Sequence, residues 1–560
     1  MSNNGTSIRF AAVILATLAL VNVAGAFSGA GSGTESDPYI ITNVNQLQEM
    51  NDDLDAWYEL GNDIDASDTM HWNGGEGFVP IGNDTNSFTG TYDGRNYTIT
   101  DLFINRSSSS YQGLFGYTKN SVIKNVGLIN VYILGYDYVG GLIGSGYATD
   151  SYATGSVTGN NFVGGLIGLG SATNSYATGS VTGNYEVGGL LGAGYTTDSY
   201  ATGSVSGGSH IGGLIGLGSA TNSYATGSVT GNELVGGLVG YHCRVYGYNY
   251  GIVPYGIVSN SYATGNISGS DSVGGLLGSG YATDSYATGN VSGTDFVGGL
   301  LGAGRATNSY ATGSVTGNYE VGGLVGEGYA STNSYATGGV TGSELVGGLV
   351  GYNCGTVSNS YATGNVSGTD FVGGLVGIND WNTISYSYST GNVSGTDFVG
   401  GLVGYQYHGT TLYSYWDIET SGTNISDGGE GKTTAEMQTK STFTNAGWDF
   451  VNIWTIREGV DYPRFIWQAL PEPEQLLADL IDYVAGLNFQ NGIANSLDAK
   501  LDAVLQALDD LNENNDVAAV NALNAFINAV EAQRGNKIPE EDADALIDAA
   551  QQIIDLLTNG

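Results

Sequence analysis

The chain has 560 residues, among them 93 Gly and 38 Tyr, and its 14 Lys and Arg stand against 53 Asp and Glu, for a net charge of −39. Such an acidic surface repels nucleic acid and anionic lipid, so the composition excludes proteins that bind either. Hydrophobic residues make up 41% of the chain, which is enough for a packed core and excludes a wholly disordered protein.

The first residues are typical of a secretory signal peptide. Arg9 precedes an apolar run from Phe10 to Val21, and a small-x-small pattern ending at Ala26 follows. The run is too short to cross a bilayer. We expect residues 1–26 to be removed after Ala26, leaving a secreted chain with no membrane span; an uncleaved short anchor is the alternative.

Residues 27–138 have no regular pattern, although Gly113-Leu-Phe-Gly116 resembles a degenerate copy of the repeat that follows. We expect this segment to cap a repeat array and to form its first coils.

Residues 139–404 contain eleven copies of one pattern. Each copy has the hexapeptide Val/Ile-Gly-Gly-Leu-aliphatic-Gly, and most copies continue, after small and polar residues, to Ser-Tyr-Ala-Thr-Gly. The hexapeptides begin at 139, 163, 187, 211, 235, 273, 297, 321, 346, 372 and 399, with a most frequent spacing of 24. A period of this length indicates a solenoid, in which each repeat stacks on its neighbours because it cannot bury its own apolar face.

Alternation within the repeat predicts short strands. Ala153 and Val157 fall on one face, which we expect inside a narrow coil, and Tyr152 and Thr154 fall on the face expected in water. The Gly-Gly pair marks a corner or a close backbone approach, since Gly takes positive φ freely. Whether the hexapeptide Leu or the following aliphatic residue faces the core stays open. We expect a mainly β fold, a right-handed parallel β-helix of about 24 residues per coil, followed by a small helical bundle.

The residue two positions before most of the repeated tyrosines is Asn or Asp. These residues favour turns and can stack into a structural ladder. No two Asp are neighbours, as expected if consecutive repeats stack, because like charges on adjacent strands repel. The alternation also disfavours calcium, which needs converging carboxylates, so we expect no metal and no other cofactor. The row consists of Asp150, Asn174, Asp198, Asn222, Asn260, Asp284, Asn308, Asn333 and Asn359.

The chain changes character after residue 404. We expect residues 405–467 to close the array with the aromatic anchors Trp416, Trp448, Trp454 and Trp467, and residues 468–473 to form a linker. Residues 474–560 form an acidic domain, and the last 89 residues hold 3 basic against 17 acidic side chains. Apolar stripes predict four helices: one around residues 474–487, one capped by Ser496, one ending near Gly535 and one with Pro539 in its first turn. We interpret this domain as a cap or docking module, or as a partner-binding helix face.

Parts of the sequence resemble two known families. Val-Gly-Gly-Leu-Ile-Gly at 139–144 and its ten companions resemble the GLUG motif of secreted, adhesin-like surface proteins of bacteria and archaea, and Tyr415-Trp-Asp-Ile-Glu-Thr-Ser421 looks like the segment that closes such arrays. Over residues 33–467 this resemblance implies a β-solenoid, an extracellular role and no catalytic residues. Gly492-Ile-Ala-Asn-Ser-Leu-Asp-Ala-Lys500 and Asn524-Ala-Phe-Ile-Asn-Ala-Val530 resemble the helical FIMAH domain of secreted proteins, over residues 474–557.

The two cysteines are not placed to pair. Cys243 and Cys354 each lie eight residues after the start of a hexapeptide, on the fifth and ninth copies. At ~4.8 Å per coil they are roughly 19 Å apart, beyond the ~7 Å Cα limit of a disulfide. We expect two separate thiols.

Signals for catalysis are weak. Acid–base work on a glycan needs two carboxylates close together, or a cation opposite one, and the array has only Arg244 and Arg305 as cations. We interpret the acidic residues of the array as solvated side chains in turns. The four histidines are not spaced as zinc ligands are. The acids are Glu186, Glu233, Glu320, Glu344, Asp295, Asp370 and Asp397, and the histidines are His71, His210, His242 and His408.

Binding has two candidate sites. The first is a ladder of repeated tyrosines suited to stacking on sugar rings or a protein, unless the rings only stack on each other. The second is a twelve-residue insertion at 244–255, an aromatic loop on a rigid scaffold. The ladder is Tyr152, Tyr176, Tyr200, Tyr224, Tyr262, Tyr286, Tyr310, Tyr335, Tyr361 and Tyr388, and the loop tyrosines are Tyr246, Tyr248, Tyr250 and Tyr255.

Eight Asn-x-Ser/Thr sequons lie beyond the predicted signal peptide, fit an exposed exterior and are candidate N-glycosylation sites. They are Asn83, Asn96, Asn105, Asn266, Asn290, Asn365, Asn392 and Asn424.

The sequence thus predicts a secreted or cell-surface solenoid that acts in adhesion or surface structure by multivalent binding of extracellular glycans or matrix and surface proteins. The alternatives are a polysaccharide-processing lyase or hydrolase, and an ice- or mineral-binding protein whose Thr and Ser rows order water.

Overall fold

The computed structural model describes residues 27–242, 257–468, 473–487, 489, 491–508 and 516–559. The predicted signal peptide at 1–26, Cys243 and the predicted loop tyrosines at 246, 248, 250 and 255 lie outside the described residues. The chain divides into two compact units, Met1–Lys432 and Thr433–Gly560.

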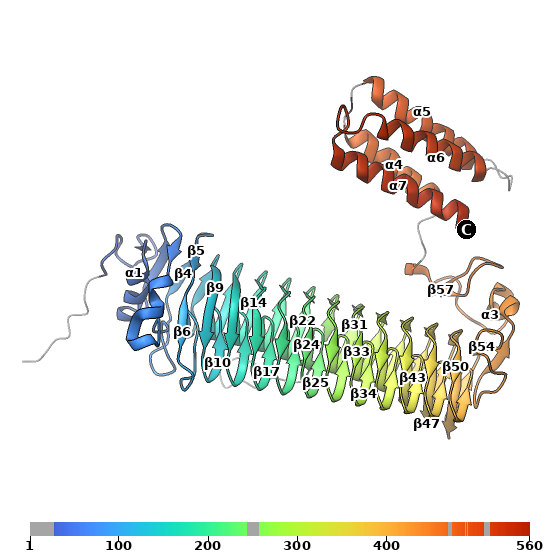
Figure 1. The fold of residues 1–560 in the computed structure, drawn as a ribbon, viewed down its shortest axis with the longest axis horizontal. Helices are drawn as coiled ribbons and strands as arrows, with labels where there is room; N and C mark the ends of the chain where they lie inside the picture. The colour runs from blue at the N-terminus through green and yellow to red at the C-terminus, as the bar shows by residue number, and fades with distance from the viewer. Residues whose placement is uncertain are drawn as a thin grey trace, which may run out of the picture. The chain divides into compact units, whose positions relative to one another are not determined.

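The first unit is a parallel β-solenoid, which confirms the predicted fold class (Figure 1). Each repeat forms one coil, and equivalent residues of successive repeats pair in register, Val139 with Val163 and Tyr152 with Tyr176. Each of the eleven repeats contributes to three sheets, called sheets 1, 2 and 3 in the order in which the chain meets them within a repeat.

Sheet 1 holds the start of each hexapeptide. Its strands are β10 (Asp137–Gly140), β13 (Asn161–Gly164), β17 (Tyr185–Gly188), β21 (Ser209–Gly212), β25 (Glu233–Gly236), β30 (Asp271–Gly274), β34 (Asp295–Gly298), β38 (Tyr319–Gly322), β42 (Glu344–Gly347), β46 (Asp370–Gly373) and β51 (Asp397–Gly400).

Sheet 2 begins at the last aliphatic residue of the hexapeptide and extends into the N-terminal segment. Its strands are β1 (Tyr39–Ile41), β2 (Trp57–Leu60), β4 (Thr91–Asp93), β7 (Phe115–Tyr117), β8 (Val122–Lys124), β11 (Ile143–Thr149), β14 (Ile167–Thr173), β18 (Leu191–Thr197), β22 (Ile215–Thr221), β26 (Val239–Tyr241), β27 (Val258–Ser259), β31 (Leu277–Thr283), β35 (Leu301–Thr307), β39 (Val325–Thr332), β43 (Val350–Ser358), β47 (Val376–Asp380), β48 (Thr383–Ser385), β52 (Val403–Tyr407) and β53 (Thr410–Leu412).

Sheet 3 carries the repeated tyrosines, and most coils give it two short strands. Its strands are β3 (Ile64–Asp65), β5 (Thr98–Thr100), β6 (Phe103–Asn105), β9 (Gly127–Leu134), β12 (Tyr152–Thr158), β15 (Tyr176–Ala177), β16 (Ser180–Thr182), β19 (Tyr200–Ala201), β20 (Val205–Ser206), β23 (Tyr224–Ala225), β24 (Val229–Thr230), β28 (Tyr262–Ala263), β29 (Ile267–Ser268), β32 (Tyr286–Ala287), β33 (Val291–Ser292), β36 (Tyr310–Ala311), β37 (Val315–Thr316), β40 (Tyr335–Ala336), β41 (Val340–Thr341), β44 (Tyr361–Ala362), β45 (Val366–Ser367), β49 (Tyr388–Ser389), β50 (Val393–Ser394), β54 (Tyr415–Asp417) and β55 (Glu430–Lys432).

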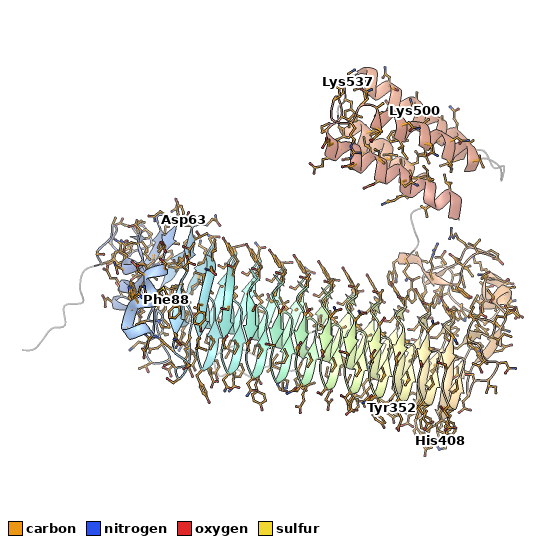
Figure 2. The ribbon with its side chains drawn as sticks, in the orientation of Figure 1. Asp63, Phe88, Tyr352, His408, Lys500 and Lys537 are labelled. Carbon is orange, nitrogen blue, oxygen red and sulfur yellow. The ribbon has the colours of Figure 1, made fainter. Side chains whose placement is uncertain are left out.

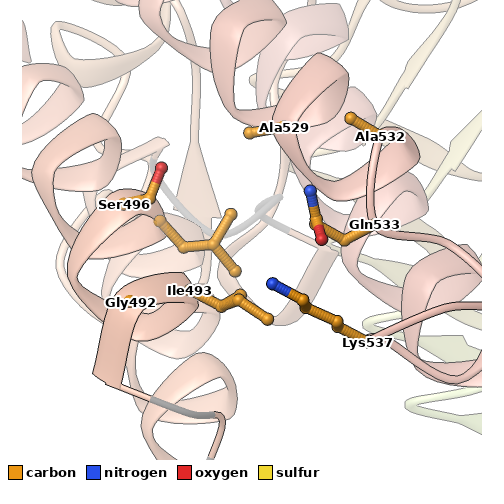
Figure 3. A pocket seen from close by; sticks show the side chains of 8 residues that line it. Gly492, Ile493, Ser496, Ala529, Ala532, Gln533 and Lys537 are labelled. Carbon is orange, nitrogen blue, oxygen red and sulfur yellow. The ribbon is translucent and has the colours of Figure 1, made fainter.

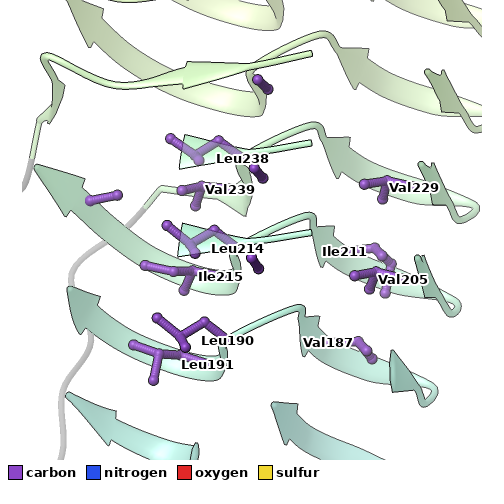
Figure 4. Close-up of a cluster of buried hydrophobic side chains, with 14 of the residues drawn as sticks. Val187, Leu190, Leu191, Val205, Ile211, Leu214, Ile215, Val229, Leu238 and Val239 are labelled. Carbon is purple, nitrogen blue, oxygen red and sulfur yellow. The ribbon is translucent and has the colours of Figure 1, made fainter. Parts of the chain in front are cut away.

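The core is a set of aliphatic rows running along the coils (Figure 4). Val187, Leu190 and Leu191 of one hexapeptide are all fully buried, so both the Leu and the aliphatic residue after it face inward. Ala201 and Val205 of sheet 3 complete the same coil. Because each coil is only one residue layer thick, these side chains are buried by the coils above and below as much as by their own.

The Gly-Gly pair is needed because the backbones of successive coils approach closely there. The expectation that these glycines have a positive φ is wrong. A Cβ on Gly189 would lie 2.1 Å from the carbonyl oxygen of Gly213 and 2.8 Å from the Cβ of Ala201. Neither Gly188 nor Gly189 has a positive φ. The hexapeptide therefore needs Gly where successive coils touch backbone to backbone.

Non-glycine residues in the left-handed region turn the chain instead. The Asn and Asp of the turn row have φ between 45° and 52°, which short polar side chains tolerate. A second row, directly before each hexapeptide, has φ between 49° and 58° in every repeat. Its members are Tyr138, Phe162, Glu186, His210, Leu234, Ser272, Phe296, Glu320, Leu345, Phe371 and Phe398.

The N-terminal segment continues the same coils under a helical cover. Strands β1, β2, β4 and β8 pair in parallel and lead into β11. The helices are α1 (Val44–Glu49), η1 (Met50–Asp52) and η2 (Ser67–Gly75), the last two being 3-10 helices. Large aromatic side chains such as Phe88 (Figure 2) fill the core here where the repeats use aliphatic ones.

The second unit begins with a small aromatic cluster. Helices α2 (Thr434–Met437) and α3 (Lys440–Thr444), strands β56 (Trp454–Thr455) and β57 (Arg464–Phe465), which are antiparallel, and the 3-10 helix η3 (Ile466–Gln468) form it. Trp448 and Trp454 are buried and lie 4.8 Å apart. Of the other predicted anchors, Trp416 packs in the solenoid core, whereas Trp467 is 52% exposed.

In the rest of the unit the described residues form four helices with a common core, as the apolar stripes predict. They are α4 (Pro473–Gly486), α5 (Asn491–Leu508), α6 (Asp516–Glu531) and α7 (Glu540–Asn559). The predicted cap at Ser496 is wrong: α5 begins at Asn491, because one more turn brings Ile493 into the core, where it is 8% exposed. Within the described residues, none of the helices is long and apolar enough to cross a membrane.

Candidate binding faces of the solenoid

The tyrosine ladder is a continuous stack. Neighbouring rings from Tyr152 to Tyr388 lie 4.7–5.0 Å apart between centroids, with interplanar angles of 1–7°. We expected these tyrosines to face water, but most are half-buried, and Tyr335, Tyr361 and Tyr388 are only 8%, 5% and 2% exposed. Each inner ring is covered on both faces by its neighbours, so the ladder presents ring edges and leaves little ring face for a ligand.

A serine ladder lies beside it that the sequence analysis missed. Each serine before a ladder tyrosine is 0–2% exposed, and its Oγ donates to the carbonyl two residues earlier at 2.7–2.9 Å. From Ser175 on, the same Oγ accepts the N–H of the equivalent serine on the preceding coil, at 3.1–3.3 Å, and the Oγ of Ser151 accepts the N–H of Val126 at 3.2 Å. The invariant Ser of Ser-Tyr was the available signal.

The Asn and Asp row forms side-chain hydrogen bonds between coils. Asn174 donates to Asp150 at 2.6 Å, Asn222 to Asp198 at 3.1 Å, and Asn308 to Asp284 at 3.0 Å. An Asn amide can donate to a carboxylate, whereas two carboxylates would repel, which is the physical reason for the alternation. This row is structural.

The residues that differ from repeat to repeat lie together on the outer faces of sheets 1 and 2. In the longer strands of sheet 2 they are the third and fifth residues, such as Leu169 and Ser171 on β14 or Ala193 and Tyr195 on β18, and they pair in register. The small ones among them are covered: Ser171 and Ala193 are only 7% and 0% exposed. In sheet 1 they are the first residue of each strand and the left-handed residue after it. Inward positions hardly vary, because the coils impose one shape on them.

Exposed tyrosines stand on these variable faces. On sheet 2, Tyr195, Tyr281 and Tyr329 are 42%, 45% and 49% exposed, and Tyr352 (Figure 2) lies on the same sheet. On sheet 1, Tyr185 and Tyr319 are 48% and 40% exposed. Unlike the ladder, these rings alternate with other residues: Tyr195 pairs with Ser171 on one side and Ser219 on the other.

The acids predicted as turn charges fall on sheet 1, mostly at the first strand position. Glu233, Asp271 and Asp295 occupy equivalent positions on consecutive coils, as do Glu344, Asp370 and Asp397. Such rows repel internally. Across the residues that the structure describes, no group of three or more His, Cys, Asp or Glu is placed to hold a metal.

Two acids stand apart in the left-handed row. Glu186 lies 3.3 Å from the Nδ1 of His210 on the next coil. Glu320 is 7% exposed, and its Oε2 has no hydrogen-bond partner among the described residues. Burial, with smaller contributions from Glu327 and Asp295, raises the pKa of Glu320 to about 8. This carboxyl is therefore held protonated at neutral pH.

The other histidines and Cys354 are dispersed. His71 and His408 are exposed, whereas His242 is buried with its Nδ1 3.0 Å from the carbonyl oxygen of Gly218, and burial lowers its pKa. The thiol of Cys354 is free and donates to the carbonyl of Gly328 at 3.4 Å. Burial raises its pKa to about 11, so it is a poor nucleophile.

The eight sequon asparagines are all exposed: Asn83, Asn96, Asn105, Asn266, Asn290, Asn365, Asn392 and Asn424.

The helical bundle has a surface pocket of about 300 Å³ between α5 and α6 (Figure 3). Its lining combines the Lys537 ammonium group and the Gln533 amide with apolar side chains such as Ile493. Lys500 donates to Ser496 from the next turn of α5. The lining residues are Gly492, Ile493, Ser496, Leu497, Ala529, Ala532, Gln533 and Lys537.

Parts of this chain are similar in sequence to known proteins. In halomucin from Haloquadratum walsbyi, 131 residues are 38% identical, covering 21% of this chain and 1% of that protein. In a "putative Gly-rich membrane protein" from Evansella cellulosilytica, 127 residues are 37% identical, covering 22% of this chain and 14% of that protein. The chain thus spans only a small part of these relatives.

A solved structure described as a "putative immunoglobulin A1 protease" from Bacteroides ovatus aligns with 78% of this chain and 95% of its own, at 18% identity. Its TM-score of 0.21 is too low for any argument about this chain.

Two family descriptions match parts of the sequence directly. Residues 342–367 match the GLUG motif, and residues 473–555 match the FIMAH domain. The chain therefore carries the GLUG motif in its solenoid and a FIMAH domain in its helical bundle.

Proposed function

We propose that this protein is a secreted or cell-surface solenoid that acts in adhesion or surface structure, by multivalent binding of extracellular glycans or proteins and without catalysis. Two proteins that parts of the chain resemble are named halomucin and "putative Gly-rich membrane protein", which supports a surface location.

The observation that carries the proposal is the placement of variation in the repeat. Side chains that hold the coil together, such as the Ser ladder and the aliphatic rows, hardly change along the array. Those that change lie on outer faces and include exposed Tyr such as Tyr195 and Tyr281. Rows of similar but unequal side chains, repeated over eleven coils, suit many weak contacts with an extended partner.

The lack of a cation opposite the described acids of sheet 1 supports a non-catalytic role. The carboxylate rows of sheet 1 have no cation facing them: Arg305, the only described cation of the repeats besides the histidines, lies on sheet 2. The buried acid, Glu320, has an apolar left-handed neighbour on each side, Phe296 and Leu345, although Glu327 and Asp295 are close enough to contribute to its raised pKa. Without a facing cation among the described residues, the acid rows favour binding over glycan cleavage.

The test is a variant without repeats six to eight, made by joining residue 270 to residue 344, which keeps the coils in register. It should still fold, because solenoid stability is close to a sum over neighbouring coils. We expect its affinity for immobilised glycans and matrix proteins to fall by about tenfold or more, since multivalent affinity falls steeply with the number of contacts.

A second variant, with Tyr246, Tyr248, Tyr250 and Tyr255 changed to Ser, separates the faces from the predicted loop. Complete loss of binding in this variant would move the site to the loop. Release of reducing ends from a glycan by the purified protein, abolished by one Asp or Glu substitution, would contradict the proposal and favour a polysaccharide-processing enzyme.

A further inference from the structure

The helical bundle has a pocket that the proposed function does not use. It lies between α5, the end of α6 and the turn that follows α6 (Figure 3). Its volume of about 300 Å³ is at the lower end of the range for pockets that bind small ligands. The pocket therefore suits a small group, such as the end of a chain, and not a long segment.

The turn after α6 fixes Lys537 beside the pocket. The backbone carbonyl of Gln533 accepts the N–H groups of Lys537 and Ile538 at 3.0 and 3.1 Å. Ile538 is 1% exposed and packs in the core of the bundle. The backbone of Lys537 is thus held in place, and its side chain lines the pocket together with the Gln533 amide.

Cations are rare in this domain, and they gather near the pocket. The last 89 residues hold 17 acidic and 3 basic side chains, the basic ones being Lys500, Arg534 and Lys537. Lys537 lines the pocket, and Lys500 donates to Ser496, which also lines it. Arg534 lies in the same turn as Lys537. Since none of the lining residues is acidic, the pocket is a favourable place for an anion in an otherwise acidic domain.

Lys537 is the cation that remains for a ligand. Arg534 makes ion pairs with Glu531, at 3.1 Å, and with Asp544, so its charge is already compensated. Lys537 is exposed and makes no ion pair with any residue that the structure describes. An ammonium group that lines a pocket and lacks a carboxylate partner can take one from a ligand.

Ser496 supplies a second donor to the same pocket. Its carbonyl oxygen and its Oγ accept from the Lys500 ammonium group at 3.0 and 3.1 Å. Because the Oγ accepts from a cation, its own hydrogen is left to donate, and the bond to Lys500 strengthens it as a donor. Lys537 and Ser496 thus offer two donors to one pocket, which suits the two oxygens of a carboxylate.

The rest of the lining favours the end of a peptide. Ile493 and Leu497 of α5 and Ala529 of α6 add apolar contact, and the Gln533 amide can pair with one peptide group. An acidic sugar would need partners for several hydroxyls and an aromatic ring for its C–H face, whereas the lining has two neutral polar side chains and no aromatic one. Phosphate or sulfate would leave the apolar side chains unused.

We propose that the pocket between α5 and α6 binds the free C-terminal carboxylate of a peptide or protein whose last residue is apolar. Lys537 and Ser496 hold the carboxylate, Gln533 bonds the last peptide group, and the apolar lining contacts the last side chain. This inference goes beyond the proposed function, because it gives the bundle a partner class of its own and leaves the solenoid faces as they are.

The experiment uses the full chain and three variants. Lys537→Met removes the ammonium group, and Ala532→Phe obstructs the pocket without a change of charge. The matched control is Arg534→Met, which removes the same charge from the same turn but not from the lining. All three residues are exposed, so the variants should fold, and circular dichroism checks this.

Binding is measured by fluorescence anisotropy of the dansylated peptides Gly-Ala-Ala-Leu and Gly-Ala-Ala-Phe, each as the free acid and as the C-terminal amide. Salt at about 0.15 M reduces the general repulsion of anions by the acidic chain. We expect at least one free acid to bind about tenfold more tightly than its amide. Lys537→Met should weaken the acid roughly ten- to a hundredfold, which is the worth of one charged hydrogen bond, and remove the difference from the amide. Ala532→Phe should weaken both forms, and Arg534→Met neither.

Several outcomes would overturn the inference. Equal binding of acid and amide by the wild type, or binding of neither, would reject the carboxylate. Equal losses in Lys537→Met and Arg534→Met would show that charge alone attracts the peptide, and unchanged binding in Ala532→Phe would place the peptide elsewhere. Displacement of the labelled peptide by inorganic phosphate or galacturonate at lower concentration than by the unlabelled peptide would make this a general anion or sugar-acid site. The adhesive function of the solenoid would stand in each case, because it is tested on other residues.

Discussion

Removing one serine of the buried ladder should destabilise the solenoid far more than its size suggests. Ser223 is 1% exposed; its Oγ donates to the carbonyl of Thr221 at 2.7 Å and accepts the N–H of Ser199 at 3.2 Å. In Ser223→Ala both bonds are lost. The Thr221 carbonyl keeps the N–H of Asp198 at 3.2 Å, so the Ser199 N–H is the group left buried without a partner.

The magnitude follows from those two groups. A buried N–H left without a partner costs about 1–3 kcal/mol, and the lost hydroxyl-to-carbonyl bond about 1 kcal/mol more. We therefore expect opening of this coil to become easier by roughly 2–4 kcal/mol. If exchange occurs through that opening, amide protons of the coil should exchange roughly thirty- to a thousandfold faster.

Hydrogen exchange followed by mass spectrometry on peptides around residues 195–230 measures the effect. Exchange is preferable to a single unfolding midpoint because a repeat array need not unfold in one step. The matched control is Ser228→Ala, which makes the same deletion at an exposed position of the same coil and should change exchange little. Equal protection in the two variants would refute the reasoning that the Ser ladder stabilises the coil.

Three further predictions concern single residues. The pKa of Glu320 is raised to about 8, so the folded state keeps its proton while the unfolded state loses it, and stability should fall as pH rises from about 4.5 to 8. Glu320→Gln should remove this fall in urea midpoints, and an unchanged profile would contradict the burial argument. Gly189→Ala should prevent folding of its coil, because the added Cβ would lie 2.1 Å from the carbonyl oxygen of Gly213. The effect would be seen as a loss of circular dichroism signal or as aggregation. A soluble variant with wild-type stability would contradict this prediction and show that the two backbones can move apart. In a variant with Cys243 replaced by Ser, Cys354 should react slowly with a thiol reagent at pH 7.5 and fully after denaturation, since burial raises its pKa to about 11. In the unaltered chain both thiols should react after denaturation without reductant. An intramolecular disulfide would contradict the predicted register.

The solenoid could be predicted because the repeat spacing determines the register of its strands. Equivalent residues of most neighbouring repeats are 24 apart, and a coil must place them above one another. The corner before each hexapeptide could not. It is occupied by Tyr138, Glu186, His210 and Leu234 among others, which share no side-chain chemistry that would signal a positive φ. The coil around them imposes the conformation, since it closes only if the chain turns there.

The tyrosine ladder shows how far site prediction could go. The sequence places Tyr152 and Tyr176 at equivalent positions, and stacking against each other or against a ligand were both open. Which applies depends on the ring orientation, and rings 4.7 Å apart at 1° leave no room between them. The tyrosines of sheet 2 did not stand out in sequence, because they recur irregularly between Ser and Arg.

Parallel pairing has a mechanical consequence for a surface protein. The hydrogen bonds that join one coil to the next run along the solenoid axis, so a pull on one end loads the bonds of the outermost coil first and peels them in turn. Each released coil of 24 residues would lengthen the chain by about 75 Å, the difference between an extended segment and the height of a coil. Under tension the array would behave as a series of small extensible links, each yielding before the next, and it would limit the peak force on whatever holds its ends.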